Sequence, residues 1–283
     1  MKSASYGVLN IVSHPHPSGT YRRIFQLAGE MSGGVNFRGD QFARTSPISE
    51  TRNGVFTGRI AIWTEIDKNA KTIQKRTLIE AALTDTTARI PDDIGFNSKI
   101  FAFAVRESDH KMYVELINEE RQTVSIKSVQ KIMQKIFDAV KPNDIDEISV
   151  FVVSRNNAIE KILEIERLTK IEIALEMPNP DDLDDAKKKI LEEIERMRAK
   201  KLKTEITIAR GETTLLLDDR YRAMAELAKD NGYVNAVGKE DGVRVERSSK
   251  DYPQEITFEL LPDESSAFAS RRIAESPQDF EKS

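Results

Sequence analysis

The 283-residue chain has no cysteine, only three histidines and a single tryptophan. Without cysteine it cannot form a disulfide framework, a cysteine-ligated zinc site or a thiol nucleophile. No apolar run approaches the roughly 20 residues that a membrane-spanning helix needs. The first residues, MKSASYGVLNIV, alternate like a strand and lack the apolar core of a signal peptide. These absences predict a cytoplasmic protein that does not insert into membranes.

Several catalytic and phosphate-binding motifs are also missing. The sequence contains no GxxxxGK[ST] loop, no GxGxxG fingerprint, no HExxH pair and no nucleophile elbow. Two weak nuclease-like patterns remain, Glu65 and Asp67 beside Lys68, and Asp185-Ala-Lys187 on an expected helix. We therefore expect no cofactor, and a binding protein more readily than an enzyme.

Charge is abundant but balanced. The chain has 43 lysines and arginines and 47 aspartates and glutamates, which gives a net charge of −4. Proteins that coat nucleic acid through bulk charge are usually basic. Any contact with phosphate must therefore come from a local basic patch.

The periodicity of the apolar residues predicts an α+β fold with mixed or antiparallel sheets and amphipathic helices packed on them. The expected strands are 5–12, 54–67, 100–105, 112–117, 147–154, 171–178 and 204–210, followed by short strands up to 262. The expected helices are 123–140, 156–168, 181–201 and 218–232, with weaker helical character at 72–83. Residues 20–47 allow no assignment.

The segment KPNDI (141–145) is the expected seam between two subdomains. Residues 1–141 would form a β-rich N-terminal subdomain with a hairpin and a lysine-faced helix. Residues 142–262 would alternate strands and helices. Residues 263–283 contain few apolar side chains, so we expect them to form a mobile tail.

The stretch SVQKIMQKIFDAV (128–140), preceded by Ser-Ile-Lys, carries the clearest pattern. Its apolar positions share one broad helical face, and we expect the helix to pack through Ile132, Ile136 and Phe137. Three lysines stand nearly opposite, one per turn and roughly 6 Å apart along the axis. They are Lys127, Lys131 and Lys135. The row is either an ordinary solvated face or a set of contacts for phosphate.

Residues 20–59 are rich in arginine and phenylalanine. Guanidinium groups can donate two parallel hydrogen bonds to a phosphate and can stack on bases. This segment is either held together by salt bridges or is a second nucleic-acid contact. The candidate contact residues are Lys127, Lys131, Lys135, Arg22, Arg23, Arg38, Arg44 and Arg52.

Two other clusters favour structural roles. His14 and His16 flank a proline and could ligate a metal, but the sequence identifies no carboxylate partners, so we expect no metal there. Basic residues from Arg196 to Lys203 end a helix that begins with aspartates. Acids first and bases last complement the helix dipole.

Three stretches resemble a known family. They are DDIGFNSKIFAFAV (92–105), IEIALEMPNPDDLDDAKKKILEEI (171–194), and KTEITIARGE (203–212) with NGYVNAVGK (231–239). Their order of elements, within 92–240, resembles the RexA-type phage-exclusion proteins, and the alternation of strands and helices is similar to the DNA-binding subunit of the Kiwa defence system.

The resemblance implies sequence-non-specific DNA binding in anti-phage defence, a homodimer or larger complex, and a partner protein that acts downstream. The residues leave open DNA or RNA as the ligand. Two alternatives also remain: a metal-dependent nuclease effector, and a protein-interaction module that binds no nucleic acid.

Overall fold

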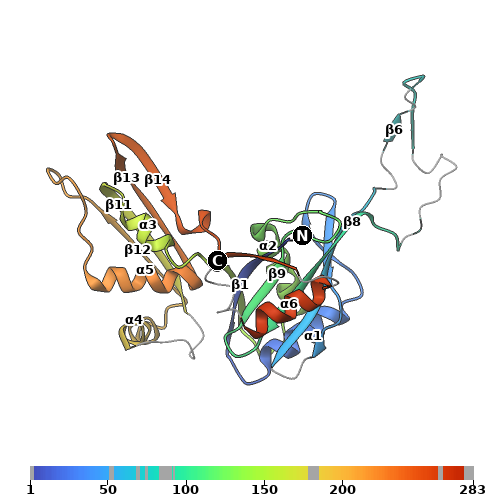
Figure 1. The fold of residues 1–283 in the computed structure, drawn as a ribbon, viewed down its shortest axis with the longest axis horizontal. Coiled ribbons are helices and arrows are strands. Elements are labelled where there is room, and N and C mark those ends of the chain that lie inside the picture. Colours follow the sequence, from blue (N-terminus) through green and yellow to red (C-terminus); the bar gives the residue numbers. More distant parts are fainter. Residues whose placement is uncertain are drawn as a thin grey trace.

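A computed structural model describes residues 3–50, 54–67, 71–73, 76–82, 91, 93–177, 185–260 and 264–276. The described chain is α+β, as predicted, and its strand pairings are antiparallel. Two large sheets, each packed with helices, form two units that lie side by side (Figure 1).

The first unit is built on a nine-stranded sheet in the order β10-β1-β9-β8-β5-β3-β2, with β15 also paired to β1 and β4 to β5. Its strands are β1 (Ser3–His14), β2 (Val35–Arg38), β3 (Gln41–Thr45), β4 (Ser49–Glu50), β5 (Val55–Thr64), β8 (Phe96–Arg106), β9 (Lys111–Glu115), β10 (Glu147–Val152) and β15 (Glu255–Glu259). Strand β1 is an interior strand that pairs with three others, because β9 lies along one side of it while β15 and β10 follow each other along the other side.

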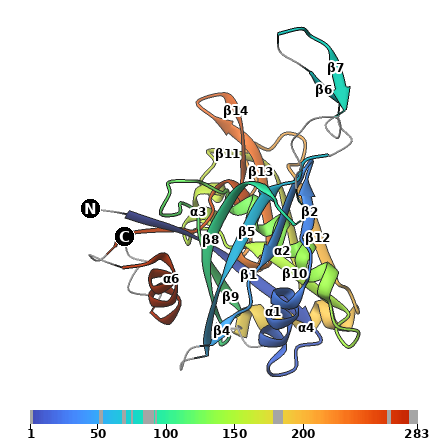
Figure 2. The ribbon, with the colours of Figure 1, turned by 90° about the vertical axis from the view of Figure 1, so that its right-hand side faces the viewer.

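Helices cover both faces of this sheet (Figure 2). Helices α1 (Thr20–Glu30) and α2 (Ile126–Val140) pack against one face, where Leu9 and Ile11 of β1 are buried. Helix α6 (Ser266–Glu275) packs against the other, over Tyr6 and Val8. Because both sides of β1 are covered, residues 6–12 in its middle contain a single polar side chain, that of Asn10.

Helix α6 corrects the expectation of a mobile tail at 263–283. Ala269, Ile273 and Ala274 are fully buried against the sheet, and the Ser265 side chain accepts a hydrogen bond from the Phe268 N–H as the N-cap. These few apolar residues are enough to hold the helix in place, because the sheet supplies the other side of the apolar contact. Residues 263 and 277–283 lie outside the described chain.

The second unit contains a four-stranded sheet in the order β12-β11-β13-β14. Its elements are α3 (Ala158–Leu163), β11 (Arg167–Glu176), α4 (Asp185–Arg196), β12 (Lys201–Thr207), α5 (Asp219–Asn231), β13 (Gly232–Glu240), β14 (Val243–Ser248) and the 3₁₀ turn η2 (Ser249–Asp251). The helices pack on one face through Ile171 and Ile173. Residues 170, 172, 203 and 205 alternate onto the opposite face, which is polar.

The boundary between the units differs from the expected seam at 141–145. Strand β10 pairs with β1, from Leu9 opposite Val152 to His14 opposite Glu147, so it belongs to the first unit. Strand β15 returns to β1 as well. The second unit is therefore an insertion between β10 and β15, a long-range pairing that local patterns do not reveal.

Two other local assignments also change. Residues 72–83, for which we expected helical character, include the hairpin strands β6 (Lys71–Ile73) and β7 (Glu80–Ala82), which project from the first sheet (Figure 1). The unassigned segment 20–47 forms α1, β2 and β3. The helix expected at 123–140 is confirmed as α2, with Ile132, Ile136 and Phe137 fully buried.

Candidate nucleic-acid interface

The lysine row lies on the solvent side of α2. Lys127, Lys131 and Lys135 are all exposed, while the residues that alternate with them are buried or half-buried. The row therefore occupies a single face, as the spacing predicts. The Ser125 hydroxyl accepts a hydrogen bond from the Ser128 N–H at 3.2 Å, which caps the helix just before the first lysine.

The two ends of the row have partners, and its middle does not. The Lys127 Nζ lies 3.3 Å from Asp251 Oδ1, and the Lys135 Nζ donates to the Asn36 carbonyl at 2.7 Å. Among the described residues, Lys131 makes no hydrogen bond or ion pair. Arg38 is exposed at the end of β2, two residues beyond Asn36.

The other candidate arginines are held by partners within the protein. Arg22 pairs with Glu50 at 3.3 Å and with Glu107 at 3.0 Å. The Arg23 guanidinium lies 2.7 Å from Asp144, and this hydrogen bond lowers the pKa of the aspartate.

Arg44 donates to the backbone carbonyls of Gly29 and Thr45 at 3.4 and 3.5 Å. Arg52 lies outside the described residues. The ion pairs of Arg22 and Arg23 therefore fit the salt-bridge interpretation of segment 20–59, whereas Arg44 is held by backbone carbonyls.

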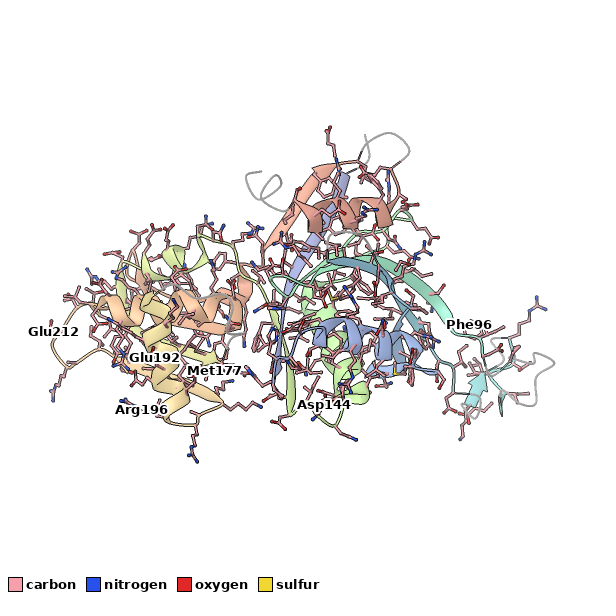
Figure 3. The ribbon with its side chains drawn as sticks, turned by 90° about the horizontal axis from the view of Figure 1, so that it is seen from below. Phe96, Asp144, Met177, Glu192, Arg196 and Glu212 are labelled. Atoms are coloured by element: carbon pink, nitrogen blue, oxygen red, sulfur yellow. The ribbon has the colours of Figure 1, made fainter. Side chains whose placement is uncertain are left out.

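The three histidines have distinct surroundings. The His14 Nε2 is 3.0 Å from the carbonyl oxygen of Met177, which Figure 3 marks at the joint between the units. The His16 Nδ1 is 3.1 Å from the Tyr21 hydroxyl, and its ring meets His110 edge-on at 4.5 Å. Within the described part of the chain, no three histidine or acidic side chains gather as a metal site would require.

The second basic cluster is mostly ion-paired. Lys201 lies 3.2 Å from Glu176, Lys203 lies 2.9 Å from Glu172, and Lys200 pairs with Glu147 of the first unit. These pairs join β12 to β11 and Lys200 to β10. The role is structural but not the one expected, because α4 ends at Arg196 and Lys201 already lies in β12, so these lysines do not complement a helix dipole. The side chains of Asp185 and Lys187 fall outside the described residues.

Glu172 shows how these pairs contribute to stability. Its hydrogen bonds with Lys203 and Tyr233 lower its pKa below the usual value, so the carboxylate stabilises the fold at neutral pH. This contribution is lost as the pH falls from the ordinary carboxyl pKa toward the depressed one. We expect Glu172→Gln to lower the thermal midpoint at about pH 7 and to lower it less at about pH 3. Circular dichroism melts across this range test the difference.

Glu205→Gln is the matched control, because Glu205 also pairs with a lysine but its side chain is 47% exposed, against 16% for Glu172. An exposed pair contributes little. A Glu172→Gln effect that is equal at both pH values would contradict the role of the carboxylate.

No local sequence pattern indicates one further group of cations. The Lys250 Nζ lies 3.7 Å from the centroid of the Tyr233 ring, and the Lys201 Nζ lies 5.8 Å from the same point. Lys127 is close enough for its charge to lower the pKa of Lys250. These residues are far apart in the chain, so only the tertiary structure reveals that the lysine row of the first unit meets a basic corner of the second.

No helix in the described part of the chain is long and apolar enough to cross a lipid bilayer. A comparison with curated proteins finds no match. A family model described as a domain of unknown function matches residues 2–275, which include both sheets and nearly all of the chain. The chain therefore belongs to the DUF4747 family.

Proposed function

We propose that this protein binds nucleic acid without sequence selection, as the binding subunit of a bacterial anti-phage system that acts with a partner protein. The observation that carries the proposal is the exposed row of Lys127, Lys131 and Lys135 on one face of α2. Phosphate contacts of this kind fix position but do not read bases. The row would therefore accept DNA or RNA.

The packing of α2 supports this use of the row. Its opposite face is fixed in the core by Ile132 and Phe137, so the lysines are carried on a rigid element. Each ammonium that contacts a phosphate releases condensed counterions, which makes binding favourable and sensitive to salt. The overall charge of −4 opposes bulk attraction to a polyanion, so the local row must supply the contacts.

The defence role, the cytoplasmic location, the homodimer or larger complex and the partner protein are further parts of the proposal. They are supported by the resemblance of residues 92–240 to the RexA-type proteins. The exposed row is compatible with a separate partner surface, because it covers only one side of the first unit.

The triple variant Lys127→Ala, Lys131→Ala, Lys135→Ala tests the proposal. We expect weaker binding to unrelated duplexes by a similar factor, and a salt slope flatter by roughly 2–3 units, near 0.9 for each lost phosphate contact. Electrophoretic shift or fluorescence anisotropy titrations at several salt concentrations measure both quantities. Folding should be preserved, because exposed substitutions usually change stability by less than about 0.5 kcal/mol.

A matched control removes three cations from another helix. Lys188, Lys189 and Arg196 lie on α4, and Figure 3 marks Arg196 there. Their triple alanine variant has the same net charge as the test variant but keeps the row. If both variants bind like the wild type, or lose affinity equally, the row is an ordinary solvated face. Cleavage of plasmid with Mg²⁺ or Mn²⁺ would instead favour the nuclease alternative.

A further inference from the structure

The basic corner of the second unit and the adjoining end of the α2 row together place three lysines near one aromatic ring. Lys250 comes from η2, Lys201 from β12 and Lys127 from α2, and they approach one another near Tyr233 of β13. The corner therefore lies at the joint between the two units, at the N-terminal end of the lysine row.

The backbone that carries Lys250 is held firmly. The hydroxyl of the buried Ser249 accepts a hydrogen bond from the Val234 N–H at 3.0 Å, and the Ser249 carbonyl accepts one from the Ser154 hydroxyl at 3.0 Å. The Arg155 N–H also donates to the Tyr252 carbonyl at 2.8 Å. Turn η2 is thereby fixed both to β13 and to the segment that follows β10, so its lysine is preorganised.

Tyr233 is held in place by close strand packing. It follows Gly232, where an added Cβ would lie 1.9 Å from the Ala174 carbonyl oxygen. Only glycine allows this approach of β13 to β11. A hydrogen bond between the Tyr233 hydroxyl and Glu172 further limits movement of the ring.

The charges around Lys250 are unevenly matched. Lys127 pairs with Asp251, Lys201 with Glu176 and Lys203 with Glu172. Lys250 itself makes no ion pair with a described residue. Loss of water over the ring lowers its pKa, and the nearby charges of Lys201 and Lys127 lower it further, while the charge of Glu172 offsets part of this shift. The residue as a whole is exposed, so an anion at this point would add to the countercharge that Glu172 supplies only in part.

We propose that Lys250, Lys201 and Lys127 bind a phosphate group beside Tyr233, so that a nucleic-acid backbone lying on the α2 row continues onto the second unit. The proposal rests on the proposed function and extends it from one helix to a path across both units. Phosphate suits the corner because an ammonium group is a compact donor that contacts phosphate as a point charge. The phosphate could belong to a nucleic-acid backbone or to free phosphate, and the experiment separates these sources.

The first measurement uses the wild-type protein. The lowered pKa leaves a larger fraction of the Lys250 amine unprotonated near neutral pH, so a limiting amount of an acylating reagent should modify it faster than Lys188 and Lys189, as measured by mass spectrometry. A single-stranded or duplex oligonucleotide should slow this modification. Inorganic phosphate at the same phosphate concentration should protect less, because it gains nothing from the row.

The second measurement uses the double variant Lys201→Met, Lys250→Met, which keeps the apolar stems and removes two charges. We expect the salt slope for oligonucleotide binding to flatten by about 1–2 units, near 0.9 for each lost contact. The variant Lys250→Arg keeps the charge and should bind like the wild type. If the double variant unfolds, Lys250→Met alone should flatten the salt slope by about one unit, because Lys250 is exposed and its replacement breaks no ion pair with a described residue.

The outcomes separate this proposal from the one on which it rests. If the α2 triple variant loses affinity but Lys201→Met, Lys250→Met does not, the phosphate corner is wrong and the row stands. If free phosphate protects Lys250 while oligonucleotides do not, the continuous path is overturned. If the α2 triple variant also binds nucleic acid like the wild type, the proposed function fails as well. Loss of affinity in both variants, with oligonucleotide protection of Lys250, supports the path.

Discussion

Replacing Phe137 by alanine is expected to lower the free energy of unfolding of the first unit by about 3–5 kcal/mol. Phe137 is fully buried on α2, and its ring meets that of Phe25 on α1 edge-on, with centroids 5.1 Å apart. The substitution removes the apolar contact of a large side chain and leaves a cavity that the neighbouring helix and sheet cannot fill completely.

Urea unfolding followed by tryptophan fluorescence measures this loss. Trp63 is the only tryptophan and lies on β5, so its emission reports the first sheet rather than the second. Lys131→Ala on the exposed face of the same helix is the control, and should change stability by less than about 0.5 kcal/mol. A similarly small loss for Phe137→Ala would mean that α2 is not packed as described.

Replacing Ile273 by alanine is expected to cost about 2–5 kcal/mol. Ile273 is fully buried in α6, within the cluster that includes Tyr6, Tyr113 and Ile256 of the sheet. The truncated side chain would weaken the contact that holds the C-terminal helix against β1 and its neighbours. A mobile tail, as expected from composition, would instead show no loss.

The neighbouring Phe268 provides the control for this prediction. It lies on the same helix but is 54% exposed. Phe268→Ala should therefore change the urea midpoint little, while Ile273→Ala should shift it clearly to lower denaturant. Equal effects of the two substitutions would contradict the burial pattern of α6. A change in hydrogen exchange confined to 266–275 and β1 would locate the loss at this contact.

The binding row illustrates what spacing can establish. A 3.6-residue period places Ile132, Ile136 and Phe137 on one side and the lysines on the other, and the helix obeys this period because its apolar face must be buried. The same logic could not assign segment 20–59. There Arg22 forms an ion pair with Glu107 and Arg23 forms one with Asp144. Both acids are far away in the chain, and no local pattern identifies such partners.

The amino-acid sequence by itself determined the α+β class, helix α2 and the exposure of its lysines, because each follows from local periodicity and the burial of apolar side chains. Only the tertiary structure decided the packing of α6, the insertion of the second unit between β10 and β15, and the meeting of Lys127 with Lys250 beside Tyr233. These features depend on contacts between distant segments. The free energy of these contacts comes from surfaces that become complementary only after the chain has folded. Short sequence patterns therefore cannot predict them.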